Sequence, residues 1–270
     1  RVAAVACAAG LAGLLAFAVP HRAASPVAVA AAADVVDLPA LTNSAGMRFV
    51  RLPAGGFVAG SPRLEAGRRE DERQHAAAVG PGLYAAVTEV TRGQYRAVMG
   101  RPSDAPGDAG SPPDLDDTLP ACPVSWASAA EFCRRLTARE AGRAYRLPTE
   151  VEWEYACRAG ATGPFAGTGR LDEMGWYAGN SGGRLHAVAG KRPNRWGLFD
   201  AHGGVREWCA DAYGGDEAFR GDLPSAPLMR AARGGSVDDP DDGCRSARRD
   251  ARDESVPAGR TGFRPVLMLP

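Results

Sequence analysis

The chain opens with an apolar stretch that contains no charged side chain. Arg1 precedes this stretch, which covers residues 2–19, and His21-Arg22 and an alanine-rich segment follow it. A basic residue, an apolar run and an Ala-x-Ala ending are typical of an export signal. The run is also nearly long enough to span a bilayer. The pattern predicts three segments: a signal peptide or membrane anchor at 1–33, a linker at 34–42, and a folded domain at 43–270.

The folded domain begins with alternating apolar and polar positions. Within residues 47–52, apolar side chains alternate with Arg48 and Arg51. This period of nearly two residues predicts a strand. A Pro-Ala-Gly-Gly turn at 53–56 and a second apolar run at 57–60 follow, so we expect a hairpin.

Three capping boxes predict three short helices. In each box a Ser or Thr hydroxyl accepts a hydrogen bond from the third amide, while Gln or Glu reaches back. The boxes run from Thr91 to Gln94, from Ser128 to Glu131 and from Thr149 to Glu152, and Gly100 and Gly160 are expected to end the first and third helices. The apolar spacing places these side chains inward: Tyr95, Val98 and Met99; Ala129, Phe132, Cys133 and Leu136; Trp153, Ala156 and Cys157.

Glycine and proline are abundant, with 34 and 21 residues among 270. So many turn-forming residues favour short elements joined by long loops, and they argue against a helical bundle. Hydrophobic residues make up 45% of the chain, which is enough for a sizeable core. We therefore expect an α+β domain with short helices and short antiparallel strands, and a solvated loop at the charged segment 67–74.

Charge and cysteine usage exclude two kinds of site. The 32 Lys and Arg balance the 32 Asp and Glu, so no long-range field draws the chain to nucleic acid or an anionic membrane. Contact with a membrane is expected only through the N-terminal segment. Five of the six cysteines lie beyond the apolar stretch, so at least one stays unpaired internally, and none has the spacing of a zinc site.

Several ordered motifs identify a family. They are the strand region at 43–60; Pro123–Trp126, Arg146–Glu150 and Glu152–Tyr155; Asn194–Asp200 and Gly203–Trp208; and Arg233–Ser236, Cys244–Arg248 and Thr261–Arg264. Together they resemble the sulfatase-modifying factor, or formylglycine-generating enzyme, family over about residues 43–268. The predicted domain is therefore of the sulfatase-modifying-factor type.

The resemblance implies a fold related to C-type lectins. The founding enzymes of the family oxidise a sulfatase cysteine to formylglycine, using molecular oxygen and Cu(I) held by two thiolates. Other members serve in ergothioneine synthesis, in siderophore maturation or in binding, so membership does not fix the activity. Cys133 and Cys157 match two disulfide cysteines of the animal enzymes, but Arg249 and Pro265 occupy the partner positions. Any disulfide would need other pairings.

The copper site that the resemblance implies is incomplete. In the oxidases the two cysteines follow the Gly-Gly-Ser motif by three and by eight residues. Counted from Ser236, the eighth residue is Cys244, but the third is Asp239. A carboxylate is a hard ligand and a poor partner for Cu(I), so copper is not expected. Ser236, Asp239 and Cys244 remain the candidate catalytic residues.

Two interpretations of this segment stay open at the level of sequence. The acidic run at 238–242 is a solvated turn, or it contacts a hard cation or a cationic substrate. Cys244 is a small buried hydrophobe, or it is a reactive thiol whose pKa is lowered by Arg245, Arg248 and Arg249.

A calcium site of the family carries over to four residues of this chain. The matching positions are Asp200, Gly203, Val205 and Glu207, and two carboxylates with backbone oxygens suit a hard cation. The alternative is that a buried Arg or amide binds Glu207. The family's other calcium loop would lie between residues 180 and 193, which lacks the acidic residue needed, and His202 is expected to serve in packing.

These observations leave three functional hypotheses. The first is an extracytoplasmic, calcium-stabilised binding module for a protein or peptide ligand, with a groove near Ser236 and Cys244. The second is a diverged oxidoreductase that acts on a protein or small-molecule thiol through Cys244 and Asp239. The third is the extracytoplasmic sensor part of a longer membrane protein, suggested by the absence of an initiator Met.

Overall fold

The computed structural model describes residues 35–100, 117–214 and 228–269. The predicted signal peptide or anchor at 1–33 lies outside these residues. The end of the predicted linker is more ordered than expected, because residues 40–42 form a strand and the Val36 amide donates to the Arg195 carbonyl. Within the described residues, no helix combines the length and the apolar character needed to cross a bilayer.

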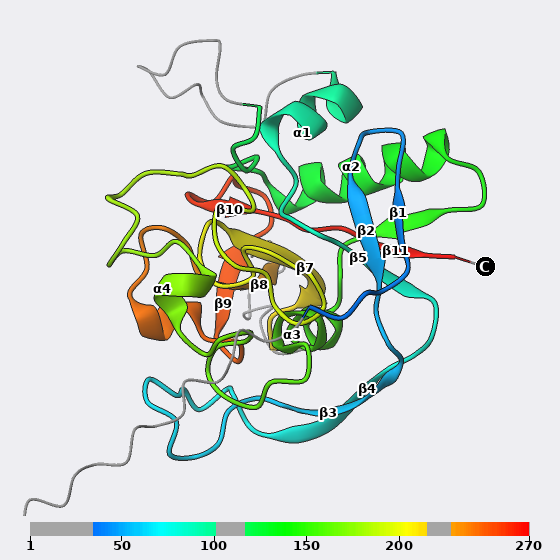
Figure 1. Ribbon diagram of the computed structural model, residues 1–270. Coiled ribbons are helices and arrows are strands. Elements are labelled where there is room, and N and C mark those ends of the chain that lie inside the picture. The colour runs from blue at the N-terminus through cyan, green and yellow to red at the C-terminus, as the bar shows by residue number, and fades with distance from the viewer. Residues whose placement is uncertain (1–34, 101–116, 215–227, 270) are drawn as a thin grey trace, which may run out of the picture. The chain divides into compact units, whose positions relative to one another are not determined.

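The described chain consists of short strands and short helices joined by loops (Figure 1). In chain order they are β1 (Ala40–Thr42), β2 (Arg48–Arg51), β3 (Gly55–Ala59), β4 (His75–Val79), β5 (Leu83–Ala86), α1 (Arg92–Met99), α2 (Trp126–Arg139), β6 (Ala144–Arg146), α3 (Glu150–Arg158), α4 (Leu171–Met174), β7 (Arg206–Ala212), β8 (Met229–Arg233), the 3-10 helix η1 (Asp241–Cys244), β9 (Arg249–Asp253), β10 (Thr261–Gly262) and β11 (Val266–Met268). The predicted α+β class with short elements is confirmed.

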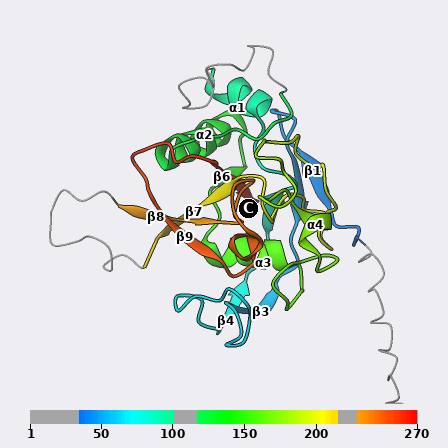
Figure 2. The same cartoon turned by 90° about the vertical axis from the view of Figure 1, so that its left-hand side faces the viewer.

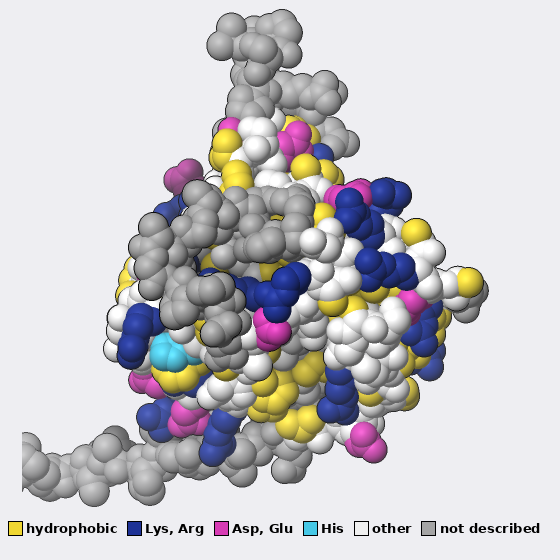
Figure 3. Space-filling view, turned by 90° about the horizontal axis from the view of Figure 1, so that it is seen from above, with side chains coloured by type: hydrophobic (Ala, Val, Ile, Leu, Met, Phe, Trp, Pro, Cys, Tyr) yellow, Lys and Arg dark blue, Asp and Glu magenta, His cyan; other side chains and the backbone are white. Residues whose placement is uncertain are grey.

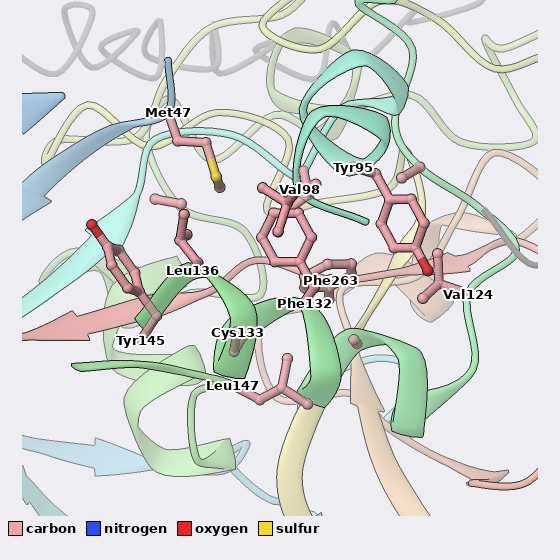
Figure 4. Close-up of a cluster of buried hydrophobic side chains, with 14 of the residues drawn as sticks. Met47, Tyr95, Val98, Val124, Phe132, Cys133, Leu136, Tyr145, Leu147 and Phe263 are labelled. Atoms are coloured by element: carbon pink, nitrogen blue, oxygen red, sulfur yellow. The ribbon is translucent and has the colours of Figure 1, made fainter. Parts of the chain in front are cut away.

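An antiparallel sheet in the order β1-β2-β5-β11-β6 separates two clusters of buried apolar side chains. Phe49 and Val50 are neighbours in β2, yet both are buried, because Phe49 belongs to one cluster and Val50 to the other. Side chains of α1 and α2 fill the first cluster, where the rings of Phe132 and Phe263 meet edge to face 5.1 Å apart (Figure 4). Tyr155 of α3 packs in the second cluster.

The predicted hairpin between the first two apolar runs is wrong. β2 pairs with β1 and β5, whereas β3 pairs with β4 in a separate two-stranded sheet. The Leu52 amide still donates to the Leu83 carbonyl, so the chain follows β5 before it turns away. The hydroxyl of Tyr155 then donates to the Pro53 carbonyl, and its ring packs on Phe57. Helix α3 thus contacts the turn at Pro53 and strand β3, while β1 and β5 are the strand partners of β2.

Two of the three predicted capping boxes are confirmed. Thr91 and Thr149 accept from the third amide, and Gln94 and Glu152 reach back to the cap amide. The third box is wrong, because α2 begins three residues earlier with Ser125 as its cap.

The helix ends also follow the sequence closely. Gly100 caps α1 in the left-handed conformation, as expected. In α3 the left-handed cap is Ala159, with φ of 46°, one residue before the expected Gly160.

A four-stranded sheet in the order β10-β7-β8-β9 carries the candidate site, and Figure 2 shows β7, β8 and β9 of this sheet side by side. Its strands pair antiparallel except for β10 and β7, which are parallel. Trp153 and Cys157 of α3 pack against Cys209 of β7 and Ala231 of β8. The loops that precede β7 and follow β8 therefore lie against a rigid helix and sheet.

Candidate functional site

The turn after β8 brings the three candidate catalytic residues together. Gly235 has φ of 72°, and a Cβ on it would lie 2.7 Å from the Cys244 sulfur, so only glycine fits. The Ser236 hydroxyl donates to Asp239 Oδ2 at 2.8 Å, and the Asp239 carboxylate raises the pKa of the Cys244 thiol. The structure therefore brings the three residues together, and their catalytic role stays a prediction.

The Asp239 carboxylate belongs to a closed network of hydrogen bonds. Its Oδ1 accepts from the Arg206 guanidinium, and its Oδ2 accepts from Ser236. Arg206 also donates to Asp250 Oδ2 at 3.3 Å. Both oxygens of Asp239 are therefore engaged, and its charge is offset by an arginine that the sequence analysis did not single out.

The Cys244 side chain is fully buried, and it resembles a small apolar residue more than a nucleophile. Burial is the main cause that raises the pKa of the thiol, and the Asp239 carboxylate raises it further. The thiol is therefore protonated near neutral pH.

The sequence interpretation in which neighbouring arginines lower the pKa of the Cys244 thiol is wrong. Each of the three following arginines forms an ion pair with carboxylates of its own: Arg245 with Glu65 and Glu72, Arg248 with Asp250, and Arg249 with Glu150.

The five cysteines of the described chain are all free and buried. Burial raises the pKa of Cys133 and of Cys157 to about 12. The expectation that both sit on inward helix faces as inert thiols is confirmed.

The His202 side chain is buried and makes two specific hydrogen bonds, so it does more than fill space. Its Nδ1 donates to the Cys244 carbonyl at 2.8 Å, and its Nε2 accepts from the Ala166 amide at 3.0 Å. These partners fix one neutral tautomer, and burial lowers the pKa of the ring to about 4. The imidazole therefore holds the end of η1 in place.

The predicted calcium turn lies directly beside the Gly-Gly-Ser turn. The Gly203 amide donates to the Gly234 carbonyl at 2.7 Å, and the Val237 amide donates to the Gly204 carbonyl at 3.0 Å. These two backbone hydrogen bonds, with His202 as a third link, make one rigid unit of the two candidate sites.

Glu207 is paired as the alternative interpretation expected. Its carboxylate is fully buried and accepts from Arg264 at 2.7 Å and from the Trp153 indole at 2.7 Å. Arg264 Nε lies 3.0 and 3.2 Å from the two oxygens. Four donor contacts use the lone pairs of this carboxylate.

Two further buried carboxylates lie near Glu207. Asp200, with φ of 59°, accepts from the Ala189 amide at 2.6 Å, while its buried Oδ1 has no partner. Glu89 accepts from the Val205 amide at 2.8 Å and was missed in the sequence analysis. Burial raises the pKa of Asp200 to about 6, and burial with the charges of Asp200 and Glu207 raises that of Glu89.

The acid cluster of Glu89, Asp200 and Glu207 has three carboxylates against one guanidinium, that of Arg264, which pairs with Glu207 and lowers the pKa of Glu89 and of Asp200. Burial and the repulsion between the carboxylates outweigh this effect and raise the pKa of both, so the cluster lacks positive charge. A hard divalent cation would supply this charge and fits the unpartnered Asp200 oxygen. It does not fit the saturated oxygens of Glu207, and no group of three His, Cys, Asp or Glu side chains in the described ranges is arranged to hold a metal.

Comparisons with known proteins agree with these motifs. The family described as "Sulfatase-modifying factor enzyme 1-like domain" matches residues 37–269. A formylglycine-generating enzyme of Streptomyces coelicolor is 34% identical over 168 residues, which are 54% of this chain and 51% of that enzyme. The chain thus spans about half the length of that relative. The enzyme of the same name from Thermomonospora curvata is 31% identical over 261 residues, which are 85% of this chain and 80% of that enzyme.

Two other similar proteins carry different descriptions. The "Inactive C-alpha-formylglycine-generating enzyme 2" of Mus musculus is 33% identical over 143 residues, which are 48% of this chain and 41% of that protein. The solved structure of PvdO from Pseudomonas aeruginosa has a TM-score of 0.72 at 26% identity, over 87% of this chain and all of PvdO.

The acid cluster predicts an unusual dependence of stability on pH in calcium-free buffer. The pKa of Asp200 is about 6 in the folded state against 3.8 for a free side chain, so the folded state binds more protons between these values. The free energy of unfolding should therefore fall by about 2–3 kcal/mol between pH 4 and pH 6.5, relative to the Asp200→Asn variant. Urea unfolding at several pH values measures this difference. The exposed Asp238→Asn variant should show no such difference, and a flat difference for Asp200→Asn would contradict the assignment.

The buried thiol predicts slow alkylation of Cys244. In the native protein at pH 8, iodoacetamide should modify Cys244 at least about a hundredfold more slowly than it modifies glutathione. Peptide mapping by mass spectrometry measures the rate, and the same peptide should react fully in urea. Rapid labelling of native Cys244 would show that the site opens and that the thiol is reactive.

Proposed function

Because the chain belongs to the sulfatase-modifying factor family, we propose that it is an extracytoplasmic binding module, stabilised by calcium, that lacks Cu(I)-dependent cysteine oxidation. The family and its fold were both expected from the motifs, and both are confirmed. The observation that carries the proposal is the state of Asp239, whose two oxygens are bound by Arg206 and Ser236.

The residues present do not fit Cu(I). Two thiolates are the ligands that this soft ion needs, and at the two matching positions the chain has one protonated thiol and one carboxylate. The carboxylate is hard and already paired. No oxidation step can be derived from such a site.

A binding role is supported by the rigid loops around Ser236. The turn is held by Gly235, by the His202 contact to the Cys244 carbonyl and by the backbone bonds to residues 203 and 204. At its rim Asp238 is half exposed, with 53% of its side chain accessible, and it pairs with Arg260 at 3.2 Å. Rigid loops with exposed charges of both signs suit a protein or peptide ligand.

Calcium would be held chiefly by Asp200. The unpartnered Oδ1 would be its carboxylate ligand and the backbone oxygens of Gly203 and Val205 would be its other hard donors, while the Glu207 oxygens stay with Arg264 and Trp153. A bound dication would offset the excess negative charge of the acid cluster. Its role would be to stabilise the turn that the Gly-Gly-Ser segment rests on.

The alternative is a diverged oxidoreductase that uses Cys244 and Asp239 on a thiol substrate. Copper-free oxidation would need a reactive thiolate, and the raised pKa of Cys244 disfavours one.

The proposed extracytoplasmic location rests on the apolar N-terminal segment of the sequence.

The first test is an assay for the oxidase activity. The full chain is incubated with Cu(I), oxygen and a sulfatase-type cysteine peptide, and mass spectrometry detects conversion of the thiol to an aldehyde. We expect no aldehyde above the copper-free background. An aldehyde product would show that Asp239 is compatible with the oxidase, and oxygen consumption that is lost in Cys244→Ser would support the alternative function.

The copper interpretation has a matched pair of variants. Asp239→Cys should bind Cu(I) at least about tenfold more tightly than the wild type, measured by competition with bicinchoninate, because it supplies a second thiolate beside Cys244. Asp238→Cys places a thiol one residue away, on the exposed side, and should leave Cu(I) binding close to that of the wild type. Equal gains in the two variants would contradict the position assigned to the pair.

The calcium proposal predicts a shift in thermal stability at pH 7.5. A calcium concentration about a hundred times the Kd should raise the Tm of the wild type by about 5 °C or more. The Asp200→Asn variant should lose most of this gain, while its left-handed backbone is tolerated by asparagine. Magnesium should give a smaller shift, because it needs a stricter octahedral site. Equal calcium shifts in the wild type and in Asp200→Asn would sink the proposal.

A further inference from the structure

The loop between β3 and β4 carries charges of both signs, and its acidic residues bind other segments of the protein. Residues 61–74 contain four arginines and four carboxylates. Glu65 and Glu72 bind Arg245 at 2.7 and 2.8 Å, and Asp71 accepts from the Tyr213 hydroxyl. Three of the four carboxylates therefore have partners supplied by other segments. The solvated loop expected from the sequence is in fact anchored through its acidic residues.

A cavity of about 400 Å³ is lined by other residues of the loop. Its lining is Ser61, Arg63, Arg68, Arg73 and Gln74, with no carboxylate among these residues. Among the described residues, none of the three lining arginines forms an ion pair, and Arg68 Nε donates only to the Ser61 carbonyl at 3.3 Å. Three arginines therefore line one polar cavity that has no carboxylate in its lining, although Arg73 also borders a second cavity lined by Asp71 and Glu72.

The ends of the loop are fixed to the protein interior. Gly60 has φ of 83°, and a Cβ on it would lie 2.6 Å from the Arg73 carbonyl oxygen. The Gly60 amide donates to Glu154, and the Gly60 carbonyl accepts from Arg158, at 2.9 Å each. The Ser61 amide donates to the Glu72 carbonyl at 3.0 Å. This backbone is preorganised, so binding would cost little conformational entropy.

We propose that this cavity binds a tetrahedral oxyanion, phosphate or sulfate, either free or as the monoester of a small molecule. Guanidinium groups match such oxygens with pairs of parallel hydrogen bonds, and Gln74 adds a neutral donor. The volume exceeds that of one oxyanion and is typical of small-molecule sites, so it leaves room for an organic part. Its lining shares no residue with the turn at Ser236 or with the acid cluster, although the loop contacts η1 through Arg245.

Calorimetric titration of the full chain tests the proposal, with inorganic phosphate, inorganic sulfate and glucose 6-phosphate as probes at constant ionic strength. The Arg68→Gln/Arg73→Gln variant should bind each anion about tenfold more weakly than the wild type. The control is Arg69→Gln, which removes the same charge from the same loop but from a residue outside the cavity lining, and it should change affinity by less than about twofold.

The outcomes separate a built site from diffuse surface charge. Tighter binding of glucose 6-phosphate than of phosphate supports a monoester ligand, and equal binding supports a free anion. Absence of saturable binding for all three probes overturns the proposal, as does an equal loss in Arg69→Gln. If the double variant unfolds, Arg63→Gln decides, because its exposed side chain lines the cavity without an anchoring contact.

Discussion

The buried ion pair of Glu207 and Arg264 joins the two larger sheets and the loop that precedes β7. Glu207 lies in β7, while Arg264 lies between β10 and β11 and also donates to the Ala86 carbonyl of β5 and to the Phe199 carbonyl. Both side chains are nearly inaccessible, at 1% and 2%. Removing one partner would leave a buried charge uncompensated, at a cost of about 3–5 kcal/mol. The position of the acid cluster therefore follows from this pair, and so does the charge balance around Asp200.

Other buried guanidinium groups play the same part where regular structure is scarce. Arg233 and Arg158 share the Glu154 carboxylate, and Arg158 reaches on to the Gly60 carbonyl. Such charge-assisted hydrogen bonds hold loops that no strand ladder supports. Several of the arginines are therefore paired with carboxylates in the protein interior rather than exposed. On the face seen in Figure 3, Lys and Arg side chains are scattered in small groups among acidic and apolar ones rather than gathered into one patch.

Local features were predictable from the sequence, and non-local pairings were not. The capping boxes at Thr91 and Thr149 each depend on four consecutive residues, and both were confirmed. The predicted cap at Ser128 was wrong, because Ser125, three residues before it, caps α2 instead. The hairpin failed because β2 is paired by β5 and by β1, not by its successor. In the site, motif spacing placed Ser236, Asp239 and Cys244 together. Arg206 and Glu89 were missed, since each reaches its partner from a distant part of the chain.

The place of β11 in its sheet has a consequence for biosynthesis. This strand comes near the end of the described chain, yet it lies between β5 and β6 and hydrogen-bonds to both. Until residues 266–268 leave the ribosome, β5 and β6 each present an unpaired edge, and the earlier strands have no complete sheet. Contacts this distant in sequence also form slowly. A chain that stalls before this point would expose both unpaired edges at once, so this sheet can close only after residue 268 has left the ribosome.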